Sequence, residues 1–314
     1  DDFADFENYE YHIQVGKIEY TPQKADFIRP ALKAGLEIEK LVGVNPYKFG
    51  LIGSTDSHSG LSSPEESNFL GKFATDSTPE TKQRLGGQLS ANGWDMSASG
   101  LAAVWAKHNT REEIFAAFKR REVYATSGPR ITLQLYAGWF FPEGAEASND
   151  FSNIGSEYGV PMGGELVLSS ESQNSISILI SATKDPKGAN LDRVQIVKGW
   201  IDEQGHSYEK VYNVAWSGDR KVGEDGKLSP IANTVDLESG RYENSVGDER
   251  FTLKWIDPDF NVSQKSFYYA RVLEIPTPRN SLFDSIALQL NNPPRGAKTI
   301  QERAYSSPIW YHPN

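Results

Sequence analysis

The segment of this sequence best suited to chemistry is a polar loop that carries a carboxylate and an imidazole two residues apart. Asp56 and His58 flank Ser57 within the tract Gly53–Gly60. In extended backbone, side chains at positions i and i+2 point to the same side, so both groups can reach one cation. Because the chain contains no Cys, any metal must be held by His and carboxylate ligands. Asp56 and His58 are therefore the candidate metal ligands.

Three further residues are candidates for holding a substrate. Thr55 precedes the Asp-x-His triplet, where its hydroxyl could orient a ligand or contact a bound oxyanion. Arg121 and Ser127 flank a second polar region, and an Arg near backbone amides can clamp a phosphate or carboxylate group. The alternative for Arg121 is a structural role, since basic residues often complement the carboxyl end of a helix. No residue is assigned as a general acid or base.

The elements around these loops alternate between helix and strand over residues 1–128. The apolar spacing within Asp26–Val42 predicts an amphipathic helix that stops at Gly43. The run Tyr47–Ile52 predicts a short buried strand that leads into the Asp56 loop. A capping box at Thr110 begins a second helix, and Val123–Thr126 predicts the next strand. In such α/β patterns, reactive loops follow the carboxyl ends of strands.

Residues 129–314 have a different sequence pattern, in which segments of strand-like alternation are separated by turn residues. The pattern predicts a mainly antiparallel, β-sandwich-like domain. The predicted strands are Ile131–Tyr136, Ile176–Ala182, Val194–Ile201, Tyr208–Trp216, Phe267–Ile275 and Tyr305–Tyr311. We therefore expect a fold of class α/β plus all-β, with one domain at 1–128 and a β-rich accessory domain at 129–314.

The string Phe49–His58 resembles the Gly-Ser-Asp-x-His element of the polymerase and histidinol phosphatase (PHP) superfamily. Thr55 is an extra residue between the Ser and the Asp of that element. Other segments resemble an uncharacterised bacterial family related to PHP proteins. These segments are Ala4–Glu7, Gly43–Gly50, Asn109–Glu112, Arg121–Gly128, Ile275–Arg279 and Glu302–Tyr311.

The resemblance implies that residues 1–128 are the later part of a distorted β/α barrel. It also implies that Asp56 and His58 bind divalent metal ions, namely zinc, manganese or iron. PHP-like enzymes begin with a His-x-His strand motif and take most of their metal ligands from before the Asp-x-His element. This chain has five His and no His-x-His. We expect the missing ligands on an upstream segment of the same protein, or on another chain, that completes the barrel.

The leading functional hypothesis is a metal-dependent hydrolase that uses a metal-activated water on a small-molecule phosphoester. One alternative is hydrolysis of a carboxylic or carbamic ester or amide, since the same hydroxide can attack carbon. The other alternative is a non-catalytic, β-rich binding module in which the Asp-x-His loop is a relic.

Composition narrows the classes of protein that the chain can be. Its 314 residues allow two domains at roughly 100–200 residues each, and 38% hydrophobic with 24% charged residues indicates a folded chain. A net charge of −10 argues against a general nucleic-acid-binding surface. No stretch reaches the ~20 apolar residues that a membrane span needs. The absence of Cys, the low pI and the β-rich domain favour a secreted or periplasmic location.

Overall fold

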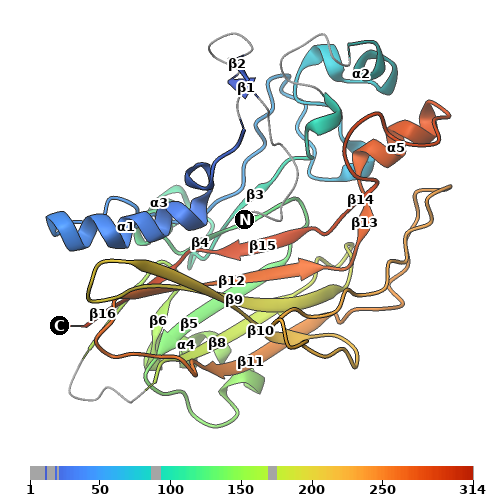
Figure 1. Ribbon diagram of the computed structural model, residues 1–314. Helices are drawn as coiled ribbons and strands as arrows, with labels where there is room; N and C mark the ends of the chain where they lie inside the picture. Colours follow the sequence, from blue (N-terminus) through green and yellow to red (C-terminus); the bar gives the residue numbers. More distant parts are fainter. Residues whose placement is uncertain (1–10, 13–17, 20, 86–92, 169–174, 314) are drawn as a thin grey trace.

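The computed structural model describes residues 11–12, 18–19, 21–85, 93–168 and 175–313. The segment Ala4–Glu7 lies outside this part of the chain. In Figure 1, helix α1 (Ile28–Val42) lies against a large sheet, and this sheet lies against a smaller one. No helix in the described ranges is both long and apolar enough to cross a bilayer.

The large sheet joins strands from both predicted domains. Its main order is β10 (Ser207–Trp216), β9 (Leu191–Ile201), β12 (Ser266–Glu274), β15 (Arg303–Ser306), β4 (Val123–Thr126) and β3 (Leu101–Val104). Strand β16 (Ile309–His312) also pairs with β12, and it pairs in parallel with β7 (Glu165–Val167). The other pairs in this sheet are antiparallel. Since β15 pairs with β4, the sheet crosses the boundary predicted at residue 128.

The smaller sheet is antiparallel and faces the large one. Its order is β11 (Arg250–Ile256), β8 (Ser177–Thr183), β5 (Thr132–Gly138) and β6 (Val160–Pro161). Ile178 and Ile180 of β8 share a buried core with Val194 and Ile196 of β9. Two-residue pairs are formed by β1 (Tyr11–His12) with β2 (Ile18–Glu19), and by β13 (Thr277–Pro278) with β14 (Thr299–Ile300).

Helices cover the outer faces and one end of the sheets. Besides α1, the helices are α2 (Pro79–Leu85), α3 (Arg111–Arg120), α4 (Phe151–Tyr158) and α5 (Asn280–Ala287). The 3₁₀ turns are η2 (Lys24–Asp26), η3 (Glu66–Asn68), η4 (Ala74–Asp76), η5 (Gly93–Asp95) and η6 (Ala145–Ala147). Leu32 and Leu36 of α1 pack against Val197 and Phe267 of the large sheet. Gly43 ends α1 at φ 80°, a left-handed conformation that glycine adopts without strain. The helix predicted within Asp26–Val42 is confirmed.

The structure confirms a mixed α/β fold with mostly antiparallel sheets, and it differs from the expectation in three places. Tyr47–Ile52 is not a regular strand. Tyr305–Tyr311 divides into β15 and β16 around Pro308, since proline has no N–H to donate to a ladder. Among the described residues the strands close no barrel, and β3 pairs with β4 in the antiparallel sense.

Candidate functional site

The loop that carries Asp56 and His58 starts beside the edge of the large sheet. The Gly53 N–H donates to the Leu101 carbonyl (3.0 Å), and the Gly100 N–H donates to the Ser54 carbonyl (2.9 Å). A Cβ at Gly53 would lie 2.6 Å from the carbonyl oxygens of Leu101 and Thr126, so only glycine fits there. This close approach places the start of the loop next to the end of β4.

Asp56 and His58 converge at the surface of this loop. Asp56 Oδ1 lies 3.4 Å from His58 Nε2, and their side chains are 65% and 55% exposed. Asp56 has a φ of 46°, so the backbone there is left-handed and not extended as the sequence predicts. The side chains therefore meet because the chain turns at Asp56, and the structure brings the two predicted metal ligands together.

Residues 72 and 73 hold the loop from beneath. The His58 N–H donates to the Lys72 carbonyl (2.7 Å), and the His58 ring stacks on Phe73 with centroids 4.7 Å apart. The Lys72 side chain is buried and places Nζ 3.4 Å from Asp56 Oδ2. One carboxylate oxygen of Asp56 thus faces an ammonium group, while the other faces the imidazole.

Hydroxyl groups shape the same loop. Thr55 Oγ1 accepts a hydrogen bond from the Ser57 N–H (3.2 Å), and Ser57 Oγ lies 3.3 Å from Ser59 Oγ.

The described ranges contain no group of three or more His, Asp or Glu side chains that could hold a metal ion. Asp56 and His58 therefore supply two donors, fewer than the three protein ligands typical of a catalytic zinc site.

Arg121 lies at the opposite end of β4 from Ser127, in a different polar cluster. It adopts the left-handed conformation that ends α3, and its Nη1 donates to the Lys48 carbonyl (2.9 Å). Its Nη2 lies 3.4 Å from Glu165 Oε1. Partial burial raises the pKa of Glu165, but Lys48, His312 and Arg121 together outweigh burial and lower this pKa overall. About 15–20 Å of chain separates Arg121 from Ser127, so these predicted substrate residues do not share one site.

Ser127 contacts a buried carboxyl group. Its Oγ donates to Glu302 Oε2 and accepts a hydrogen bond from the Arg303 N–H (2.8 Å). Burial raises the pKa of Glu302 to about 8, and the negative charge of Glu66 adds to that shift. The Ser127 hydroxyl therefore orients Glu302. Direct contact between Ser127 and a substrate remains a prediction.

Three buried carboxyl groups near Ser127 escaped the sequence analysis. Burial also raises the pKa of Glu274, and the charge of Glu302 adds to the effect. Glu66 is matched by donors: its Oε2 accepts from Asn280 N (2.6 Å) and Nδ2 (2.8 Å), and its Oε1 accepts from Ala98 N (3.1 Å). The available sequence signal was Glu274, a carboxylate inside the apolar run Phe267–Ile275.

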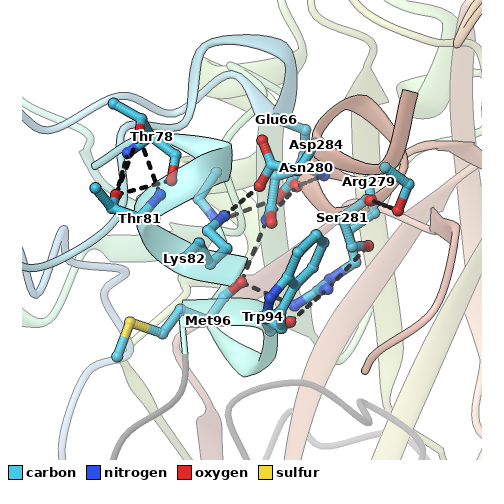
Figure 2. Close-up of polar contacts among 12 residues, drawn as sticks. Glu66, Thr78, Thr81, Lys82, Trp94, Met96, Arg279, Asn280, Ser281 and Asp284 are labelled. Carbon is cyan, nitrogen blue, oxygen red and sulfur yellow. Dashed lines mark hydrogen bonds and ion pairs between the residues drawn. The ribbon is translucent and has the colours of Figure 1, made fainter. Parts of the chain in front are cut away.

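Buried basic groups fasten the segment that carries Trp94 and Met96 to α5 (Figure 2). Arg279 donates to the carbonyls of Trp94 (3.1 Å) and Met96 (2.8 Å). Lys82 of α2 forms a buried ion pair with Asp284 of α5, and its Nζ lies 5.5 Å from the centre of the Trp94 ring. These contacts hold Glu66 and Asn280 in place from two sides.

One family of proteins matches almost the whole chain. The family is described as "Protein of unknown function (DUF3604)", and its match covers residues 1–313. No curated protein and no solved structure matches the chain. The family description names neither an activity nor a superfamily, so the relation to PHP enzymes remains a prediction.

Proposed function

Because the chain belongs to the DUF3604 family, whose description assigns no activity, we propose a function from the site itself. The protein is a metal-dependent hydrolase that acts on a small-molecule phosphoester and is related to the PHP enzymes. The convergence of Asp56 Oδ1 and His58 Nε2, 3.4 Å apart on an exposed loop, carries this proposal.

The donor set suits the proposed metals. A carboxylate oxygen and an imidazole nitrogen are ligands that zinc, manganese and iron accept. Asp56 Oδ2 faces the Lys72 ammonium group, so Oδ1 is the oxygen that meets the cation in this proposal, while Phe73 stacks on the His58 ring. When bound, a divalent ion lowers the pKa of a water ligand and polarises the scissile group. In this proposal Thr55, next to Asp56, orients the substrate.

Further ligands come, in this proposal, from an upstream segment of the same protein or from another chain that completes a barrel. Exposed apolar side chains on two helices support such a partner. Leu41, Val42 and Val44 at the end of α1 are 83%, 68% and 67% exposed, and Phe115 and Phe118, one turn apart on α3, are 62% and 40% exposed. Exposed apolar side chains that are grouped together often mark a surface that a partner covers, whereas single ones do not.

Metal binding and hydrolysis, measured on the full-length gene product, test the proposal together. We expect binding of Mn²⁺ or Zn²⁺ by calorimetry, and metal-supported hydrolysis of an aryl phosphate in preference to an aryl ester or carbamate. His58→Ala should remove both, because it deletes a ligand without touching the sheet core. His206→Ala is the matched control, since His206 also lies exposed beside a carboxylate, 3.6 Å from Asp202.

Several outcomes decide between the alternatives. If the enzyme prefers the aryl ester or carbamate, its substrate is a carboxylic or carbamic ester or amide and not a phosphoester. Unchanged metal content and turnover in His58→Ala would overturn the assignment of the site. Less than about one tenth of a metal per chain in the wild type would favour the non-catalytic binding module.

A further inference from the structure

A cavity of about 330 Å³ lies beside the buried carboxyl groups and is separate from the Asp56–His58 pair. The segment after β4, the end of β12, strand β13 and α5 all contribute to its wall. Its volume lies within the range of about 300–1,000 Å³ that is typical of small-molecule sites.

Glu274 is the reason to regard this cavity as a binding site. Glu274 is 1% exposed and lines the cavity. Its Oε1 has no hydrogen-bond partner in the described part of the chain. Gly188 lies beside this oxygen, since a Cβ built there would come within 3.4 Å of it. A buried polar atom without a hydrogen-bond partner destabilises the fold, and a donor on a ligand would remove that penalty.

The rest of the lining indicates the charge of that ligand. Glu302 and Asp185 add carboxyl groups to that of Glu274, and Ser127 holds the Glu302 carboxyl in position. The rings of Tyr242 and Phe283 also line the cavity, and aromatic faces attract cations. The described residues offer no group of three metal-ligating side chains here. An organic cation with N–H donors fits a lining of carboxyl groups and aromatic rings.

Two basic side chains in the lining favour a zwitterion over a simple amine as the ligand. Arg130 and Lys187 line the same cavity and are exposed, whereas Glu274 and Glu302 are buried. A ligand that places an ammonium group against the buried carboxylates can therefore meet positive charge at its other end.

We propose that this cavity binds a small zwitterion, with its ammonium group against Glu274 and Glu302 and its anionic group toward Arg130 and Lys187. This inference does not rest on the proposed hydrolase activity.

Binding should release protons. Burial raises the pKa of Glu274 and of Glu302, so an ammonium group that restores the ionised carboxylates displaces protons from them. Affinity should accordingly rise with pH through neutrality. The charged and titratable groups that face these two carboxyls are Asp185, Lys184, Tyr242, Glu66, Arg279 and Arg303.

Calorimetry on the full chain tests the proposal with 4-aminobutyrate as the probe. Butyrate lacks the ammonium group and 1,4-diaminobutane lacks the anion, so both should bind more weakly. Glu274→Gln and Glu302→Gln should each weaken binding of 4-aminobutyrate by roughly tenfold or more. Glu165→Gln is the control, since this carboxylate lies in the Arg121 cluster. Titrations in phosphate and Tris buffers should differ in heat because of proton release.

The glutamine variants keep the size of the side chain, and their thermal midpoints show that they are folded. Binding of butyrate as strong as that of 4-aminobutyrate would overturn the proposal. Unchanged affinity in Glu274→Gln would do so too, as would the absence of binding to the wild type at 10 mM probe, roughly the weakest affinity expected of a specific site. Equal binding of 1,4-diaminobutane would refute the role of Arg130 and Lys187.

Discussion

Carboxylate side chains occur in two contrasting regions of this protein. The Asp56 carboxylate is exposed beside His58 and touches one ammonium group, that of Lys72. The carboxyls of Glu66, Glu274 and Glu302 lie buried beside the cavity. Water solvates the exposed Asp56 carboxylate. A buried carboxyl group has no such solvation, so it must be stabilised by protein donors, by protonation or by a ligand. The exposed loop is therefore free to change its chemistry at little cost in stability, and the cavity is not.

The largest difference between the regions should follow from Glu66→Ala. This change leaves the N–H groups of Ala98 and Asn280 buried without their acceptor. We expect the free energy of unfolding to fall by about 3 kcal/mol, measured by urea denaturation. Glu157→Ala, at an exposed position of α4, should stay within about 0.5 kcal/mol of the wild type. Equal losses in the two variants would remove the contrast between buried and exposed carboxylates.

A second test uses pH. Because Glu302 has a pKa of about 8 in the folded protein, above its unfolded value, its protonated form stabilises the fold below the unfolded pKa. That stabilisation is lost as pH rises through about 8. Between pH 5 and pH 8, the wild type should lose on the order of 2 kcal/mol more than Glu302→Gln. Thermal midpoints at both pH values measure this difference, and parallel pH profiles would contradict it.

The smallest effect is expected from His58→Ala. The imidazole is more than half exposed and packs on Phe73 from one side. Loss of the stacking should lower the free energy of unfolding by less than about 1 kcal/mol in chemical denaturation. A loss comparable to that of Glu66→Ala would mean that the loop is part of the structural core.

Local signals in the sequence determined much of the secondary structure. The Thr110 side chain accepts a hydrogen bond from the Glu113 N–H and begins α3, as its capping pattern predicts. Gly43 ends α1, and Val123–Thr126 forms β4. Helix caps and apolar periodicity act within a few residues, which is why the sequence alone reveals them.

Tertiary structure alone decided which strands share a sheet and where the carboxylates lie. Glu274 and Glu302 come from β12 and the segment before β15, and Glu66 lies more than two hundred residues earlier in the chain. Their proximity depends on the pairing of β15 with both β12 and β4. The sequence by itself singled out the Asp56–His58 pair by its two-residue spacing, but the two groups meet because the folded loop turns at Asp56, where φ is 46°. It could not reveal the cavity, because the burial that shifts those carboxyls arises only when distant strands pair.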